Sequence, residues 1–260
     1  MKSNPSDLPA ELAGLLAQSR ARLGPFGSVH FFSEVTSTND VAVPLPEGAV
    51  VLADRQTAGR GRRGHTWFSP PGSGLYASVV LAPVRSSDPT RATVLLTLAA
   101  GVALAEGVDA ASGLRVDLKW PNDLYVSRRK LAGILAEASG DRVVLGFGLN
   151  TSVASYPPDL HERVTSIESA LGRSIDRYPV FVETLAALSR RYDDLLLGRF
   201  DAILDAWRRR APAAVGARVA RTVNGVVETG VTAGIDDNGG LLVRMGDHVE
   251  RIVSGELEWL

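Results

Sequence analysis

Three glycines and three arginines interleave within six residues of this chain, at Gly59-Arg-Gly-Arg-Arg-Gly64. Glycine lets a backbone come close to a ligand and adopt a positive φ, while arginine offers a planar, permanently charged set of donors to a carboxylate or phosphate. This pattern indicates a mobile cationic loop that closes on an anion. A second interpretation stays open at this point, namely a solvated basic loop or an arginine-glycine arm that binds nucleic acid.

Two common phosphate-binding motifs can be excluded for this loop. The spacing Gly59-x-Gly61-x-x-Gly64 matches a dinucleotide fingerprint, which has meaning only between a strand and a helix. The residues after Gly64 are His-Thr-Trp-Phe-Ser-Pro-Pro-Gly, and prolines with a glycine do not open a helix. A P-loop is excluded because His65 and Thr66 stand where that motif needs Lys followed by Ser or Thr.

Polar residues that a core does not require extend the same chemistry. Hydroxyl and amide side chains gather at Ser37-Thr38-Asn39, just before apolar residues that begin a helix. One of them fits an N-cap, and the spare hydroxyls suit a small polar ligand. Further cations, amides, an indole and one carboxylate follow along the chain, and they are Gln56, Arg60, Arg62, Trp67, Lys119, Asn122, Asp123, Lys130 and Asn150.

This set of residues is rich in cations and amides and poor in nucleophiles. The chain has four histidines without metal-ligand spacing, no cysteine and no clear Ser/His/Asp combination. Such a site does not form covalent enzyme intermediates. It brings two anionic reactants together and stabilises charge on a transferring phosphoryl or nucleotidyl group. A carboxylate that reacts with ATP is the simplest such pair.

Composition excludes several other classes of protein. The 260 residues suffice for one large or two unequal domains, and 45% hydrophobic with 22% charged residues is ordinary for a globular protein. A net charge of -1 gives no general electrostatic footprint for nucleic acid or a membrane surface. The N-terminus lacks a signal-peptide pattern, and the longest mostly apolar run, Val94–Ala105, is too short to span a bilayer. A cytoplasmic protein is the default expectation.

Hydrophobic periodicity predicts the elements that must position these residues. Leu8–Leu23 is expected as a short helix, and Asp88-Pro89 begins a long one that reaches about Ala111. The apolar stripe of that long helix is predicted at Val94, Leu95, Leu98, Val102 and Leu104. Strands are expected at Val29–Phe32, Ala49–Ala53, Leu75–Pro83, Arg115–Trp120, Leu124–Val126, Lys130–Glu137 and Arg142–Asn150, and helices at Tyr178–Leu197 and Phe200–Arg210.

The pattern changes after Ala211-Pro212, where a domain boundary is predicted. Turn signals then recur at Asn224-Gly225, Asn238-Gly239 and Gly246-Asp247. They separate four or five short strands, which predict a small barrel.

Four motifs in order along the chain resemble those of biotin protein ligases. They are Gly59–Gly64 with Trp67-Phe-Ser69, Lys119-Trp-Pro-Asn-Asp-Leu-Tyr125, Lys130-Leu-Ala-Gly-Ile-Leu135 and Gly146-Phe-Gly-Leu-Asn150. Thr36-Ser-Thr-Asn39 and the terminal Gly255-Glu-Leu-Glu258 fit the same family, and the resemblance covers Val29 to Leu260. Each motif alone is moderately specific, whereas the ordered set is highly specific.

The resemblance implies an α+β fold, with a mixed, largely antiparallel sheet and packed helices of the class II synthetase type, followed by a small SH3-like β-barrel. The implied domains are an N-terminal helical extension at 1–28, a catalytic biotin- and ATP-binding domain at 29–212 and the barrel at 213–260. The implied reaction joins biotin and ATP, with Mg²⁺, into biotinyl-5′-AMP and pyrophosphate. A lysine of a biotin carboxyl carrier domain of a carboxylase then takes the biotinyl group.

The resemblance also assigns roles to residues. Arg62 and Lys130 are implied as the catalytic cations, with Arg62 near the carboxylate and α-phosphate and Lys130 stabilising the pentavalent phosphate. The implied biotin site is Ser37, Thr38, Asn39, Gln56, Gly59, Arg60, Gly61, Arg62, Lys130 and Gly133. The implied ATP site is Trp67, Lys119, Asn122, Asp123 and Asn150, and no protein metal site is assigned. Trp120 and Phe68 are expected in the core, and Arg63, Arg128 and Arg129 in solvent.

Some family members carry an N-terminal DNA-binding domain and repress biotin operons. Only residues 1–28 precede the motif region here, so neither specific DNA binding nor a membrane partner is expected, while a homodimer stays open. A lipoate ligase, a non-catalytic biotin sensor and an RNA-binding module are the alternatives. The Gly-Arg loop and the Lys119–Asp123 turn favour biotin over lipoate. Arg62 together with Lys130 argues against a sensor, and the net charge of -1 against general RNA binding.

Overall fold

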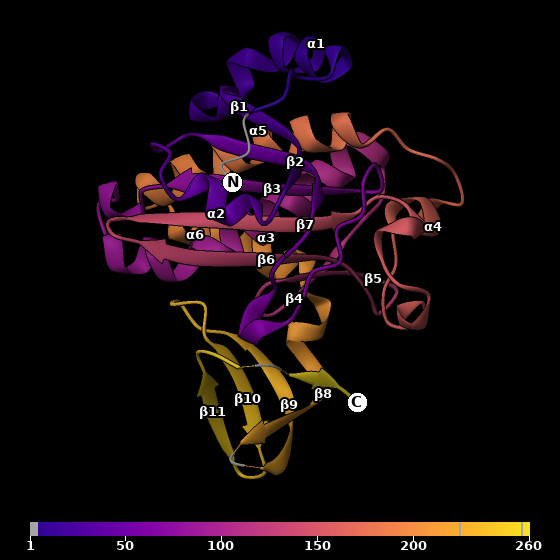
Figure 1. Ribbon diagram of the computed structural model, residues 1–260. Coiled ribbons are helices and arrows are strands. Elements are labelled where there is room, and N and C mark those ends of the chain that lie inside the picture. The colour runs from indigo at the N-terminus through magenta and orange to yellow at the C-terminus, as the bar shows by residue number, and fades with distance from the viewer. Residues whose placement is uncertain (1–4, 224, 256) are drawn as a thin grey trace.

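The computed structural model describes residues 5–223, 225–255 and 257–260, so that Asn224 of a predicted turn and Glu256 of the C-terminal motif lie outside the described residues. A seven-stranded sheet with packed helices forms most of the described chain, and a separate five-stranded antiparallel sheet follows at its C-terminal end (Figure 1). The α+β class is therefore as predicted, and the second sheet is consistent with an SH3-like barrel.

The first sheet has the strand order β1-β2-β3-β7-β6-β5-β4. Its strands are β1 (Val29–Val35), β2 (Val50–Gln56), β3 (Gly74–Leu81), β4 (Asp117–Lys119), β5 (Asp123–Val126), β6 (Arg129–Ser139) and β7 (Arg142–Asn150). Only β1 and β2 pair in parallel, and the other neighbours are antiparallel. The strand expected at Arg115–Trp120 is shorter than predicted, because its pairing with β5 starts at Asp117 and ends at Lys119.

Three helices cover one face of this sheet, α3 (Pro89–Ser112), α5 (Arg177–Leu196) and α6 (Phe200–Arg210) (Figure 1). Asp88 accepts a hydrogen bond from the Arg91 N–H at 3.0 Å and so caps the start of α3. Most of the predicted apolar stripe of α3 is buried, but Val94 is 54% exposed, so this part of the prediction is wrong. Val94 lies beside a cavity at the N-terminal end of the helix rather than against the sheet.

By length and composition alone, helix α3 could cross a membrane, because the mean hydropathy of its most apolar 18-residue window is 1.7. In the folded chain 67% of that window is buried. The helix packs against α5, α6 and β6, and this burial accounts for its composition.

The N-terminal extension is one helix followed by two tight turns. Helix α1 (Ala10–Ser19) ends earlier than the predicted helix, and 3₁₀ turns follow at Arg20–Arg22 and Gly24–Gly27. Its apolar side chains Leu12 and Leu16 are buried in the main core. The Ser6 N–H donates to the Phe31 carbonyl at 2.7 Å, so the extension also covers the free edge of β1.

The opposite face of the sheet is covered only in part. The short helix α2 (Thr38–Ala42) packs there on β2, β3 and β7 over a small apolar cluster. Along β7 the side chains of Leu145, Phe147 and Leu149 join the helix-side core, whereas Gly146 and Gly148 alternate with them and face the other way. A strand with glycine at alternate positions leaves space on that face.

The second sheet has the order β11-β10-β9-β8-β12. Its strands are β8 (Val215–Val223), β9 (Val226–Ile235), β10 (Leu241–Met245), β11 (His248–Ile252) and β12 (Glu258–Trp259). The turn between β9 and β10 attaches it to the first sheet, since the Trp120 indole N–H donates to the Gly239 carbonyl at 2.9 Å. Gly239 has φ +73 and lies so close to Leu95 and Leu98 that a side chain there would collide with α3. Trp120 is buried, as expected.

Candidate functional site

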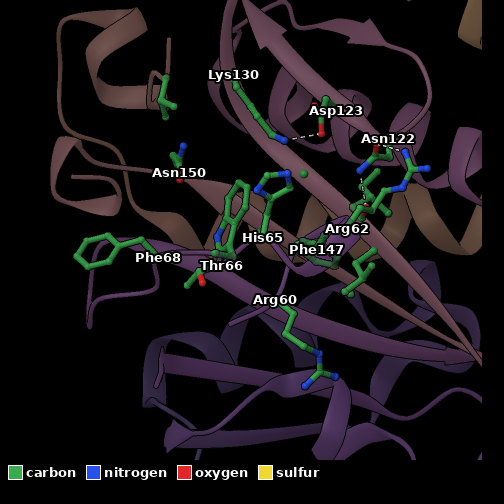
Figure 2. A pocket seen from close by; sticks show the side chains of 18 of the residues that line it. Arg60, Arg62, His65, Thr66, Phe68, Asn122, Asp123, Lys130, Phe147 and Asn150 are labelled. Carbon is green, nitrogen blue, oxygen red and sulfur yellow. Dashed lines mark hydrogen bonds and ion pairs between the residues drawn. The ribbon is translucent and has the colours of Figure 1, made fainter. Parts of the chain in front are cut away.

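A cavity of about 540 Å³, called here the main cavity, opens on the face of the first sheet that α2 leaves uncovered. Its walls come from α2, the loop after β2, the turn between β4 and β5, strands β6 and β7, the segment after β7, and the C-terminal residues Gly255 and Leu257 (Figure 2). The structure brings together nearly all predicted site residues on these walls. They are Ser37, Thr38, Asn39, Gln56, Arg60, Gly61, Arg62, Trp67, Lys119, Asn122, Asp123, Lys130, Gly133 and Asn150.

Gly59 was expected in the biotin site, but it does not line the cavity. It is buried under the loop, where its carbonyl accepts a hydrogen bond from the Trp67 N–H at 2.9 Å. A Cβ at this position would lie 2.5 Å from the Trp67 carbonyl oxygen and 2.8 Å from Ser69 Oγ. A glycine is therefore required here for close packing at the base of the loop, and this residue does not contact a ligand in the cavity.

The arginines of the loop point in opposite directions (Figure 2). Arg62 extends along the cavity wall and donates from Nη1 to Asn122 Oδ1 at 3.0 Å. Arg60 turns toward α2, where it donates to both carboxylate oxygens of Asp40 at 2.9 and 2.7 Å and to Glu137 at 3.1 Å. The hydrogen bond to Asp40 raises the pKa of Arg60 above its ordinary value. Arg62 therefore has a neutral partner, while Arg60 is already paired with carboxylates.

A chain of hydrogen bonds orients the amide and hydroxyl groups beside α2. The Gln56 Oε1 accepts from the Thr38 N–H at 2.9 Å, and its Nε2 donates to Ser69 Oγ at 2.9 Å. The Asn39 Nδ2 donates to Glu137 Oε2 at 2.5 Å. Thr38 and Gln56 thus hold each other in place and Glu137 holds Asn39, while all three side chains face the cavity.

Ser37 occupies the N-cap position of α2, as one of these residues was expected to do, but its side chain makes no capping hydrogen bond. Its hydroxyl is therefore not committed to the helix. Ser37 is buried at the wall of the cavity, which leaves a polar group there for a ligand.

Sequence reasoning missed two residues behind this wall, Ser78 and Glu137. The Ser78 hydroxyl is fully buried and lies 2.7 Å from Thr38 Oγ1 and 2.6 Å from Asn39 Oδ1. A serine inside a strand whose every residue is buried was the available signal, because a buried hydroxyl needs a partner.

Lys130 and Asp123 form an ion pair at the opposite wall, with 2.7 Å between Nζ and Oδ1 (Figure 2). This Asp123 oxygen is buried, and the Lys130 ammonium is the charged group that offsets it. The ammonium also lies 5.7 Å from the centre of the Trp67 ring. Lys130 is therefore held at the cavity, where it is 29% exposed and can meet an anionic ligand.

Trp67 fills the space that the glycines of β6 and β7 leave open. A Cβ at Gly133 would lie 3.1 Å from the Trp67 ring, and one at Gly148 would collide with the indole nitrogen. This Nε1 is buried and has no hydrogen-bond partner among the described residues. A buried donor without a partner at a cavity wall points to an acceptor on a ligand.

The far end of the cavity lies around Asn150 and the segment that follows β7. Asn150 is buried and donates from Nδ2 to the Thr165 carbonyl at 3.1 Å. Tyr156 and Leu160 of that segment also line this end, although no sequence pattern identified them. Phe68 was expected in the core, and this is wrong. The residue is 49% exposed, and its ring projects outward at the cavity rim (Figure 2).

Lys119 connects the cavity to the second sheet. Its Nζ lies 5.1 Å from the centre of the Tyr125 ring and 4.8 Å from that of Trp259, which belongs to β12. These distances are within the range of cation–π attraction. Sequence reasoning did not identify Trp259, whose place beside Lys119 depends on how the two sheets dock.

The similarity to known proteins agrees with this geometry. Residues 32–150 match the model of the "Biotin/lipoate A/B protein ligase family". The solved biotin protein ligase from Aquifex aeolicus in complex with biotin and ATP superposes with a TM-score of 0.80, at 28% identity over 90% of this chain and 98% of that chain. The fold and the site therefore define a ligase of the biotin/lipoate class.

Curated relatives narrow this class. The bifunctional ligase/repressor BirA of Bacillus spizizenii is 37% identical over 94% of this chain and 79% of its own length. The biotin--[acetyl-CoA-carboxylase] ligase of Paracoccus denitrificans is 35% identical over 80% of this chain and 90% of its own. The chain belongs to the biotin protein ligase family and is an enzyme of that type.

Proposed function

We propose that this protein activates biotin with ATP to biotinyl-5′-AMP and transfers the biotinyl group to a lysine of a biotin carboxyl carrier domain, in the cytoplasm. The observation that carries the proposal is the main cavity, where Arg62 and Lys130 face the same space as the hydroxyl and amide cluster of α2. A relative of the same fold holds biotin and ATP together, which supports this pair of substrates.

In the first step an oxygen of the biotin carboxylate attacks the α-phosphorus of ATP. The bond from that phosphorus to the bridging oxygen breaks, and pyrophosphate leaves with the bonding electrons. Arg62, which has only a neutral partner, holds the carboxylate and the α-phosphate together. Lys130 stabilises the negative charge that develops on the phosphorus oxygens.

In the second step the amine of the carrier lysine, in its neutral form, attacks the carbonyl of the mixed anhydride. An amide bond forms, the amine loses a proton and AMP leaves. Water must be kept from the anhydride until the carrier arrives, because hydrolysis would waste it. The loop that carries Arg62 forms the wall between the cavity and the surface and serves this purpose.

The polar end of the cavity supports biotin rather than lipoate. The ureido ring of biotin offers two N–H donors and a carbonyl acceptor, whereas a dithiolane ring offers no comparable hydrogen bonds. The buried Ser37 hydroxyl, which makes no capping bond, would stay without a partner if an apolar ring entered, and Thr38 and Asn39 give the same wall a polar character. The ATP end is assigned to Trp67, Asn150 and Lys119.

Mg²⁺ accompanies ATP in this proposal. The described residues include no group of three His, Asp or Glu that could hold a metal alone. Mg²⁺ usually binds through one or two carboxylates and the phosphates of its substrate, and Asp123 is the carboxylate among the described residues that line the cavity, where it also pairs with Lys130. Asp123 would hold the ion, which would neutralise phosphate charge.

Pyrophosphate release from ATP tests the proposal, measured with biotin, with lipoate and with neither acid. We expect release that requires biotin and Mg²⁺ and that lipoate does not support. Release with lipoate alone would identify a lipoate ligase. A chain that binds biotin without releasing pyrophosphate would be a sensor, and the proposal would be wrong.

A further inference from the structure

A second cavity, of about 340 Å³, adjoins the main cavity on the other side of the Arg62 wall. The two cavities share a wall, whose residues are Arg62, Arg63, Trp120, Pro121, Asn122, Ile134 and Leu135. Its remaining walls come from the N-terminal half of α3, from Ala136 on β6, from the β9–β10 turn, and from Arg251 on β11 and Val253 just after it. Both sheets are therefore needed to form it.

Positive charge dominates the second cavity. Arg62, Arg63 and Arg251 line it, and no Asp or Glu of the described residues does. Arg62 is bonded to the neutral Asn122, and no hydrogen bond or ion pair of the Arg63 guanidinium is found within the described parts of the chain. Clefts lined by one sign of charge concentrate ions of the opposite sign.

Arg251 is the one lining arginine with a carboxylate partner, Asp236. That carboxylate also accepts backbone N–H bonds from Asn238 at 2.9 Å and Gly240 at 2.8 Å, which fold the β9–β10 turn. Asp236 thus serves the turn and offsets one charge, so the three arginines leave an excess of two positive charges at the cavity.

The backbone of the loop is arranged to bring both of its arginines to this place. Arg63 has φ +55, a left-handed conformation that residues other than glycine rarely adopt, and Gly64 follows with φ +79. The chain reverses here, and Arg62 and Arg63 line both cavities as a result. Strained backbone of this kind is found preferentially where a ligand is held.

We infer that the second cavity receives the pyrophosphate that leaves the α-phosphate in the adenylation step. This inference rests on the proposed function. The leaving group departs on the side of phosphorus opposite the attacking carboxylate, and Arg62 can contact both because it lines both cavities. The two phosphate groups meet Arg63 from the loop and Arg251 from the second sheet. The barrel then takes part in the first step by binding its product.

Exchange of labelled pyrophosphate into ATP in the presence of biotin measures this binding directly. The variants are Arg63→Gln and Arg251→Gln, and the matched control is Arg244→Gln on the neighbouring strand β10, which is exposed and lines neither cavity. We expect the KM for pyrophosphate to rise about 10-fold in each cavity variant, as for loss of one charge-assisted contact, and not in the control. Biotin affinity, measured by calorimetry, should stay within about 2-fold of the parent.

The outcomes separate the inference from the proposed function. Absence of biotin-dependent exchange in the parent protein would contradict both. Normal exchange in the parent with an unchanged KM for pyrophosphate in both cavity variants would overturn the inference alone. An equal rise of the KM for pyrophosphate in Arg244→Gln would show that only the overall charge of the protein matters, and this result would also overturn the inference. If Arg251→Gln lowers the melting temperature, Arg63→Gln decides, because Arg63 has no bond within the described chain to lose.

Discussion

Lys130 and Arg62 reach the main cavity from different elements, and each keeps a partner that a phosphate can replace. The Lys130 ammonium is 2.7 Å from Asp123, and Arg62 is bonded to a neutral amide. Neither cation is locked in a fully satisfied ion pair, unlike Arg60 with Asp40 and Glu137. This difference separates the two cations assigned to catalysis from the arginine that fastens the loop.

Replacement of Lys130 by Ala should slow adenylation strongly. A charged donor aimed at developing charge is typically worth ~2.7–4 kcal/mol, or ~10²–10³ in rate. The ammonium is partly exposed, so its loss should change the melting temperature little. Rates of pyrophosphate release and melting curves are compared with those of Arg129→Ala, the neighbouring cation, which lines neither cavity. Equal adenylation rates in Lys130→Ala and the parent would remove Lys130 from the mechanism.

Ser78→Ala tests the support behind the α2 wall. The substitution leaves Thr38 and Asn39 without the buried hydroxyl that orients them. Loss of such a buried hydrogen bond costs ~1–3 kcal/mol, so the KM for biotin should rise about 10-fold while the KM for ATP stays constant. Ser33→Ala, an exposed serine of β1, is the control. An equal change in both KM values would mean that Ser78 supports the fold and not biotin binding.

Residue type predicted the cations and the Ser37–Asn39 segment, since arginine, lysine and clustered hydroxyls indicate anion and polar-ligand chemistry without any knowledge of the fold. Ser78, Glu137 and Trp259 could not be predicted in the same way. Their roles arise from strand register and from the docking of the two sheets, which bring residues together that are far apart in sequence.

Among the elements of the fold, the loop from Ala58 to His65 has a sequence that predicts mobility. It has little apolar surface to bury, so it should open readily without ligand. The bonds of Arg60 to Asp40 and Glu137 fasten its first half to α2 and β6, and the single bond of Arg62 to Asn122 fastens its second half. We expect anionic ligands to add the charged contacts that this second half lacks, through Arg62.

Limited trypsin digestion measures this opening. Cleavage after Arg60, Arg62 or Arg63 should be rapid in the free protein, partly suppressed by biotin and fully suppressed by biotin with ATP. Asp40→Asn should speed cleavage in the free protein, because Arg60 loses its charged partner, whereas Asp141→Asn on the exposed β6–β7 turn should not. Cleavage at one rate with and without biotin plus ATP would mean that the loop is only a solvated basic turn.

Most elements could be predicted because their hydrophobic period is regular, as in α3, α5 and β7. The exceptions have physical causes. Val94 follows the helical period but lies where α3 borders the second cavity. The short strand β12 carries too few residues for any period to appear, and its position is set by pairing with β8.

The whole molecule depends on contacts between its two sheets. Arg91 donates from Nε and Nη2 to the Asp237 carbonyl at 3.1 and 2.9 Å, and Trp120 donates to Gly239. The barrel is thereby held beside the main cavity, which Gly255 and Leu257 help to line. No period in the sequence indicates this docking, because it depends on single residues in turns.

The relatives include ligases that are also repressors, so DNA binding is a property to test on the whole molecule. The 260-residue chain has a net charge of -1, and we expect at most weak, salt-sensitive, non-specific binding to biotin-operator DNA. Gel-shift titrations with operator and scrambled DNA at ~200 mM salt, which weakens simple phosphate contacts, measure this. Retention of the operator alone under these conditions would contradict the expectation.

The central claim is that one cavity joins biotin to the α-phosphate of ATP and keeps the product for a carrier lysine. The most direct test is to mix the protein with biotin and ATP labelled at the α-phosphate, without carrier, and to analyse what stays bound. We predict that labelled biotinyl-5′-AMP stays bound in equimolar amount with the protein. When a carrier domain is added, the label should be released as AMP, and the biotinyl group should be found on the carrier lysine. Free labelled AMP with no bound adenylate, or an adenylate that the carrier cannot discharge, would contradict the account.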